Sequence, residues 1–256
     1  MLHINNFHLN PVFEIIPEAI YFQQTNLICE LSPDGFSYVF ENDADKKFHG
    51  LSVFHFTENA DITTQMKGIF NDQPLLHKNY KKIFISYTGE ESALLPEELY
   101  YPGENELLLK TLYGDINEGA IATDLIADKK IYNVYRMPAD IHKVIVDQFP
   151  LAAFSHHYSL LIKQGIQGDI LKIIFYRSTF IAALIKAGKL QIIHLYPYKS
   201  GADVVYHLLN ICHQFTITDV PLSIGGIILI CIRRSHIIFQ TLLLMSSPLN
   251  MNLQTA

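Results

Sequence analysis

The feature of this sequence that most constrains its fold is an order of predicted elements that occurs twice. Each of two stretches reads as three β-strands, an amphipathic helix, and a further strand that runs toward glycine. The strands are marked by short β-rich or alternating apolar runs, and the helices by apolar residues that recur at helical spacing. Corresponding positions such as Leu27 and Ile170 are offset by similar lengths along the chain. The order therefore predicts an α/β protein made of two similar units.

The first stretch opens with a predicted hairpin. Its turn, Ser32-Pro33-Asp34-Gly35, has proline at the second position and glycine at the fourth, as a type I turn prefers. A helix begins near Ile62, since apolar residues recur from there at positions i, i+4, i+7 and i+8. The strands of this stretch are predicted at 27–31, 36–40, 51–56 and 82–87.

The middle of the chain is predicted to be mostly helical. Pro96 and Pro102 bracket a short helix, and Pro138 stands where a helix prefers proline, in its first turn. Ser155 is expected to cap a further helix, because a serine side chain can accept a hydrogen bond from the first free backbone N–H groups. The other elements expected here are a helix at 104–113 and strands at 121–126 and 131–136.

The second stretch repeats the first. Its helix is opened by Ser200 and Asp203, which form the Ser-x-x-Asp pattern of a capping box. Strands are predicted at 170–175, 180–185, 190–195 and 221–226. We therefore expect a first lobe with a helical insertion at 1–166 and a second lobe, incomplete or atypical at its end, at 167–256.

Composition limits the classes of function. The net charge is −6 and no basic run exceeds two residues, which disfavours a protein that binds nucleic acid through its phosphates. The longest apolar stretch, 220–232, is too short to cross a membrane as one helix. Cys29, Cys212 and Cys231 each lie among apolar residues, which is typical of reduced thiols. We therefore expect a cytoplasmic protein with no nucleic-acid partner and no membrane span.

The duplicated βββαβ order resembles the plan of the actin, Hsp70-type chaperone and sugar-kinase superfamily, whose repeated unit is ribonuclease H-like. More narrowly, the chain resembles a bacterial, Bacteroides-type family of unknown function with an actin-like ATPase fold. The resemblance covers residues 27–226. It is carried by the 27–40 hairpin, the strand Ile83-Phe84-Ile85-Ser86, and the closing run Pro221-Leu222-Ser223-Ile224-Gly225-Gly226.

The resemblance implies a nucleotide site at the turns of the two first hairpins. In the superfamily, glycine-rich turns approach the phosphates and an Asp beside each turn serves Mg²⁺. The matching positions here are Ser32, Asp34 and Gly35 in the first hairpin, and Ser178 and Thr179 after Arg177 in the second. Gly225 and Gly226 match the turn that supports the adenosine. The second turn has neither glycine nor Asp, so the expected site is degenerate, with no catalytic residue, no metal ligand and no obligatory cofactor.

Three functions stay open on these grounds. The favoured hypothesis is a binding or scaffold protein on an actin-like frame, not an enzyme. The first alternative is an active Mg-ATP-dependent ATPase or small-molecule kinase that uses Asp34. The second is a ribonuclease H-like nuclease, for which Glu30 and Asp124 would supply two of the several acids that hold two metal ions.

The last thirty positions are unusual in charge. Residues 227–256 contain no Asp, Glu or Lys, and their only charged side chains are Arg233 and Arg234. Such an apolar segment is either an altered end of the second lobe or a surface for a protein partner. An unidentified protein partner at this segment, and an oligomer, are therefore among the expectations.

Overall fold

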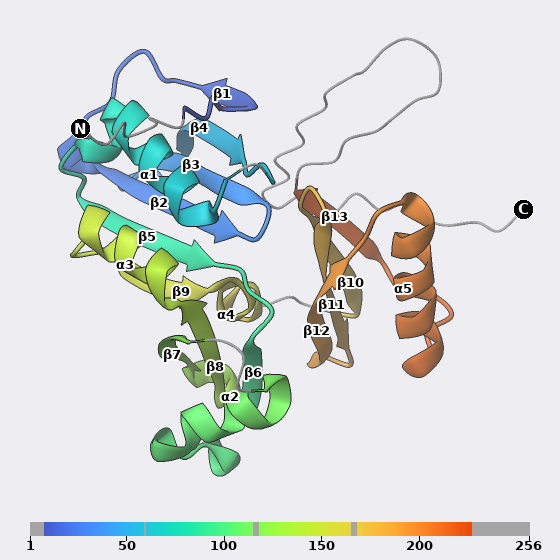
Figure 1. Cartoon of the computed structure of the whole chain (residues 1–256). Helices are drawn as coiled ribbons and strands as arrows, with labels where there is room; N and C mark the ends of the chain where they lie inside the picture. Colours follow the sequence, from blue (N-terminus) through green and yellow to red (C-terminus); the bar gives the residue numbers. More distant parts are fainter. Residues whose placement is uncertain (1–7, 59, 115–117, 165–167, 227–256) are drawn as a thin grey trace, which may run out of the picture. The chain divides into compact units, whose positions relative to one another are not determined.

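The computed structural model describes residues 8–58, 60–114, 118–164 and 168–226 (Figure 1). The predicted tail at 227–256 and Cys231 lie outside the described residues. The chain divides into two compact units, Met1–Lys163 and Gln164–Ala256.

Unit 1 is built on a six-stranded mixed sheet with the order β1-β4-β3-β2-β5-β9. The strands β1, β4, β3 and β2 pair antiparallel with one another in this order. In contrast, β2 pairs parallel with β5, and β5 pairs parallel with β9. The strands are β1 (Phe13–Ile15), β2 (Thr25–Ser32), β3 (Gly35–Asn42), β4 (Phe48–His55), β5 (Lys82–Tyr87) and β9 (Ala153–His156). The short helix α4 (His157–Lys163) follows β9 directly.

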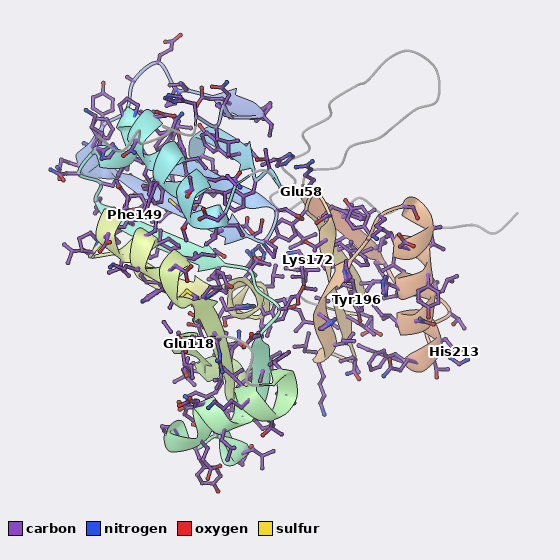
Figure 2. The ribbon with its side chains drawn as sticks, viewed as in Figure 1. Glu58, Glu118, Phe149, Lys172, Tyr196 and His213 are labelled. Carbon is purple, nitrogen blue, oxygen red and sulfur yellow. The ribbon has the colours of Figure 1, made fainter. Side chains whose placement is uncertain are left out.

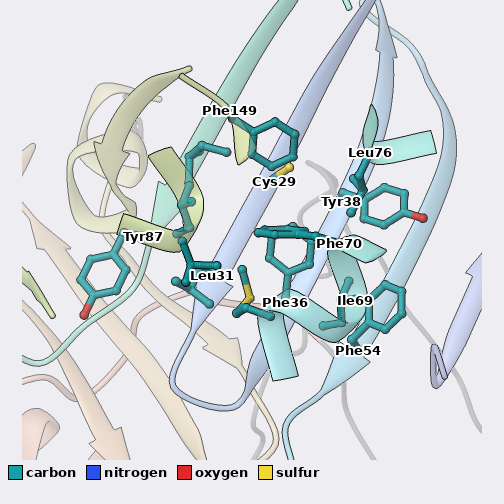
Figure 3. Close-up of a cluster of buried hydrophobic side chains, with 14 of the residues drawn as sticks. Cys29, Leu31, Phe36, Tyr38, Phe54, Ile69, Phe70, Leu76, Tyr87 and Phe149 are labelled. Atoms are coloured by element: carbon teal, nitrogen blue, oxygen red, sulfur yellow. The ribbon is translucent and has the colours of Figure 1, made fainter. Parts of the chain in front are cut away.

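The core of unit 1 lies between this sheet and two helices, α1 (Ile62–Asp72) and α3 (Ala139–Gln148). Alternate residues of β2 point into it, so Leu27, Cys29 and Leu31 are all fully or almost fully buried. Aromatic rings fill much of the space, with Phe70 of α1 edge-on to Phe149 at 5.5 Å between centroids (Figure 3). Burial raises the pKa of the Cys29 thiol, so this cysteine is an inert core residue.

Between β5 and β9 the chain forms a small subdomain. Its three-stranded antiparallel sheet has the order β6-β8-β7 and carries the helix α2 (Figure 1). Leu109 and Val134 form its fully buried centre, and the Tyr100 ring stacks on Tyr132 with centroids 3.8 Å apart. The elements are β6 (Ser92–Pro96), α2 (Asn105–Tyr113), β7 (Gly119–Ile126) and β8 (Ile131–Pro138), with three 3-10 turns, Glu97–Leu99, Pro102–Glu104 and Ala127–Lys129.

The described part of unit 2 is a four-stranded sheet with the order β12-β11-β10-β13 and one helix, α5 (Gly201–Gln214). The fully buried Phe180 is the centre of its core. Its ring stacks on Tyr196 of β12, which in turn contacts His207 of α5. The strands are β10 (Ile170–Phe175), β11 (Thr179–Lys186), β12 (Lys189–Pro197) and β13 (Leu222–Gly226). As with β2 and β5 in unit 1, β13 pairs parallel with β10.

Most predicted elements agree with the structure to within a few residues, and the strands predicted at 82–87 and 170–175 match β5 and β10. The strand β6 was not predicted, and the prediction for Ser155 was wrong. Ser155 does not cap a helix but lies in β9, and its hydroxyl donates to Asp124, because the chain there adds a short parallel strand to β5 before α4 begins. In the described part of the chain, no helix has the length and apolar character needed to cross a membrane.

The predicted capping box at the start of α5 is confirmed. Ser200 Oγ accepts from the backbone N–H of Asp203, and the Asp203 carboxylate accepts from the backbone N–H groups of Lys199 and Ser200 at 2.8 and 2.9 Å. These backbone donors lower the pKa of Asp203.

We expect Ser200→Ala to destabilise the protein by about 1 kcal/mol, because one N–H at the start of α5 loses its acceptor. Denaturant unfolding followed by circular dichroism measures the change. Ser200→Thr keeps the acceptor and should stay close to wild type. Equal stabilities of the alanine and threonine variants would contradict the role of the cap.

Candidate functional site

The first predicted turn is held tightly by neighbouring backbone. Ser32 is buried and its hydroxyl donates to the carbonyl of Gly35 at 3.3 Å, while the Phe56 N–H donates to the Asp34 carbonyl at 2.9 Å. A Cβ atom at Gly35 would lie 2.1 Å from the carbonyl oxygen of Phe54. Glycine is therefore required at position 35 by the close approach of β4.

The second predicted turn joins β10 to β11. The Tyr176 N–H donates to the carbonyl of Thr179 and the Tyr198 N–H donates to that of Ser178, both at 2.8 Å. Thr179 is the first residue of β11 and is buried. The backbone of this turn is thus fixed by strand pairing on both sides.

The two glycines of β13 reach the same edge of the unit 2 sheet as this turn. In the parallel register Gly226 is the partner of Phe175, the last residue of β10 before the turn. Gly226 has a φ of +93°, and a Cβ there would lie 2.1 Å from the Phe175 carbonyl oxygen. Ser178, Thr179, Gly225 and Gly226 therefore share one edge of unit 2, and Ser32, Asp34 and Gly35 lie at the corresponding edge of the unit 1 sheet.

A polar cluster that the sequence did not predict lies at the same edge of unit 1. Glu30 Oε1 of β2 is 2.7 Å from Nδ1 of His157, the first residue of α4, and it accepts at 3.4 Å from the hydroxyl of Thr88, just after β5. These three residues meet because the carboxyl ends of parallel strands lie at one edge of a sheet. The strand β9 places His157 at this edge, and it is only four residues long. So short a strand gives little pattern in the sequence from which the position of His157 could be predicted.

Asp124 joins the inserted subdomain to this edge. Its carboxylate accepts from the Ser155 hydroxyl at 2.8 Å and from the His156 N–H at 2.7 Å, and the Tyr135 hydroxyl lies at 3.5 Å. Glu30 and Asp124, the two acids considered for a nuclease, therefore each have protein partners. Among the described residues, no three His, Cys, Asp or Glu side chains are grouped as in a metal site.

His156, next to His157, is a buried titratable group with a strongly shifted pKa. Burial, and then the neighbouring His157, lower its pKa to about 3, so the ring is neutral at pH 7. The Tyr158 N–H lies 3.2 Å from Nδ1 in a donor contact, which leaves the ring proton on Nε2. The ring packs among Tyr87, Tyr135 and Tyr158, with centroids 4.6–6.0 Å away.

In unit 2, Lys172 of β10 is the basic residue with a perturbed pKa (Figure 2). Partial burial lowers that pKa, and Nζ donates to the side-chain carbonyl of Gln164 at 3.2 Å. Neighbouring residues of β10, Leu171 and Ile173, belong to the core under α5, so alternation places Lys172 on the opposite face of the sheet.

Comparison with solved structures identifies the fold. A protein from Bacteroides thetaiotaomicron, described as having an actin-like ATPase fold and unknown function, aligns with a TM-score of 0.74 and 18% identity, over 82% of this chain and 86% of that one. A likeness at this identity shows the fold alone. The chain is thus an α/β protein that shares an actin-like ATPase fold.

Two further structures are more distant. The cytoplasmic domain of EpsL, an inner-membrane component of the Vibrio cholerae type II secretion system, aligns at a TM-score of 0.46 and 8% identity, over 79% of this chain and 82% of that one. A PilM–PilN type IV pilus biogenesis complex aligns at 0.45 and 11%, over 78% and 81%. Likeness at this level carries no argument about this chain.

Sequence comparison places the chain in a family. No curated protein matches the sequence. The family model described as protein of unknown function (DUF3822) matches residues 18–233, which is most of the chain. The chain therefore belongs to the DUF3822 family.

Proposed function

We propose that this chain is a binding or scaffold protein whose actin-like frame carries a degenerate nucleotide site. The frame consists of two βββαβ units of the ribonuclease H-like kind, a first lobe at 1–166 with an inserted subdomain and a second lobe at 167–256. The equal strand orders β4-β3-β2-β5 and β12-β11-β10-β13, each with a helix before its last strand, support a duplication.

The observation that supports a degenerate site concerns two glycines expected to make room for the nucleotide, Gly35 at its phosphates and Gly226 at its adenosine. At both positions the space that a Cβ would occupy is already filled by backbone, from Phe54 beside Gly35 and from Phe175 beside Gly226. Glycine at these positions is explained by strand packing, and no open cradle for a nucleotide is needed to account for it.

The second turn also has the wrong chemistry for a magnesium nucleotide. Mg²⁺ prefers oxygen ligands, usually carboxylates together with the substrate phosphates. Asp34 in the first turn has such a carboxylate, but the second turn offers Arg177, Ser178 and Thr179, with no acid. The residues present therefore fit a Mg-nucleotide poorly.

We expect millimolar Mg-ATP or Mg-ADP to leave the thermal unfolding temperature within about 1 °C of the value in EDTA. A site filled to 100 times its dissociation constant would stabilise the protein by about 2.7 kcal/mol. For a chain of this size that would raise the midpoint by roughly 5–10 °C. Differential scanning fluorimetry measures the midpoint.

A magnesium-dependent rise of several degrees would instead support the ATPase or kinase alternative. Asp34→Asn is then the variant to compare, because it keeps the shape of the turn and removes the one carboxylate. Gly35→Val is unsuitable for this purpose, since the contact with Phe54 predicts that it disturbs the fold itself.

A further inference from the structure

The inserted subdomain carries an apolar groove along one side of α2. The groove has a volume of about 230 Å³ and is lined by the 3-10 segment before α2 and by α2 itself. Leu99, Tyr101 and Leu107 line it and are each more than 60% exposed, at 62%, 62% and 64%. Single exposed apolar residues are ordinary, but several that line one groove mark a binding surface.

The floor of the groove belongs to the packed interior of the subdomain. Leu95 and Leu108 line the groove and also pack against the buried cluster of Leu109 and Val134. At one side, the Asn105 amide donates to the Thr123 hydroxyl at 3.1 Å, which ties the start of α2 to β7. The groove is therefore formed before any partner arrives.

Acidic side chains lie along the segments that line this groove. Between Pro96 and Leu109 the sequence has four Glu residues and no Lys or Arg. All four are exposed, and Glu104 lines the groove itself. They are Glu97, Glu98, Glu104 and Glu106, of which Glu106 already forms an ion pair with Lys110 at 3.2 Å. An acidic rim of Glu97, Glu98 and Glu104 beside an apolar centre favours a partner that is apolar on one face and basic at its edges.

The size of the groove argues for side chains of a protein and against a small molecule. Small-molecule pockets usually hold roughly 300–1,000 Å³, more than this groove offers. A groove beside a helix that accepts a few apolar side chains is typical of recognition of an amphipathic helix. A basic amphipathic helix also complements the charge of Glu97, Glu98 and Glu104.

We propose that the groove of Leu99, Tyr101 and Leu107 binds an amphipathic helix of a protein partner, whose Lys or Arg residues meet Glu97, Glu98 and Glu104. This extends the proposed binding function by naming a surface and a class of partner. It does not depend on whether the hairpin turns bind nucleotide.

The test uses the full chain and a fluorescein-labelled peptide of Leu and Lys arranged as an amphipathic helix, with a Leu and Glu peptide of the same pattern for comparison. Fluorescence anisotropy near physiological salt, where exposed charges are largely screened beyond ~8 Å, measures both affinities. The Leu and Lys peptide should bind at least about tenfold more tightly, because only it matches the acidic rim.

Substitutions locate the binding. Leu107→Ser should weaken the Leu and Lys peptide about tenfold, as truncation of a central apolar anchor does. Glu98→Gln with Glu104→Gln should weaken it several-fold and reduce its salt dependence. The control is Leu151→Ser, which alters a leucine of unit 1 that is 94% exposed and does not line the groove, and it should leave affinity unchanged.

Three results would overturn the proposal. The first is equal binding of the two peptides, and the second is equal weakening by Leu107→Ser and Leu151→Ser. The third is a dimer in light scattering that Leu107→Ser dissolves, since the occupant would then be a second copy. Thermal shifts with Mg-ATP test the degenerate nucleotide site separately, so the two proposals can fail independently.

Discussion

Gly35→Ala is expected to destabilise the protein by about 3 kcal/mol or more. The new Cβ would lie 2.1 Å from the Phe54 carbonyl oxygen and 3.3 Å from Cα of His55, so β4 must move away from β3. Inserting a methyl group where nothing can yield typically costs about 1–3 kcal/mol, and a clash with backbone belongs at the upper end. Urea unfolding monitored by circular dichroism measures the loss.

Gly103→Ala is the matched control for this substitution. Gly103 lies in the 3-10 turn before α2, and a Cβ there would meet nothing within 4 Å. Its stability should stay within about 0.5 kcal/mol of wild type, as for most surface changes. If Gly35→Ala were as stable as Gly103→Ala, strand packing would not explain the glycine, and an open cradle for a ligand would become the better account.

The second large expected effect is a loss of folding stability at acidic pH. His156 is neutral in the folded protein, where its pKa is about 3, whereas the unfolded chain protonates it near its ordinary pKa of 6.5. The unfolded state thus binds one more proton between these values, and stability falls as the pH drops from about 6.5 toward 3. The slope approaches about 1.4 kcal/mol per pH unit, so this one side chain should cost roughly 2–3 kcal/mol between pH 6.5 and 4.5.

His156→Gln removes this titration, so its unfolding free energy should depend less on pH over that range than the wild-type value does. His49→Gln is the control, because the His49 side chain is 47% exposed and should leave the wild-type dependence intact. The carboxylate of Asp43, whose pKa is lowered by hydrogen bonds from Lys46 and Lys81, loses its contribution only below about pH 4. Identical pH profiles for wild type and His156→Gln would refute the buried neutral histidine.

The order of elements could be predicted from the sequence because local signals coincide with tertiary packing. The turn residues Pro33 and Asp34 predict the hairpin of β2 and β3, and Ser200 predicts the start of α5. The apolar spacing from Ile62 matches the buried side of α1. Each of these patterns involves residues only a few positions apart, so it can be recognised in a single sequence.

The polar cluster of unit 1 could not be predicted in this way. Glu30, Thr88 and His157 are brought together by parallel pairing across β2, β5 and β9, which no local pattern specifies. The strand β9 has four residues, and β6 consists largely of Ala and Leu, which favour a helix as readily as a strand. The packing reason for Gly35 depends on β4, whose distance from the turn the sequence does not state.

The position of the inserted subdomain has a consequence for how this family can change over evolutionary time. β5 and β9 are neighbours in the sheet, yet residues 88–152 separate them in the chain. The free energy needed to close such a loop grows only logarithmically, by about 0.6 kcal/mol for each doubling of its length. Parts of the subdomain outside the unit 1 core, such as β6 and α2, can therefore be gained, lost or remodelled with little penalty to the sheet, and the groove can diversify while the frame stays constant.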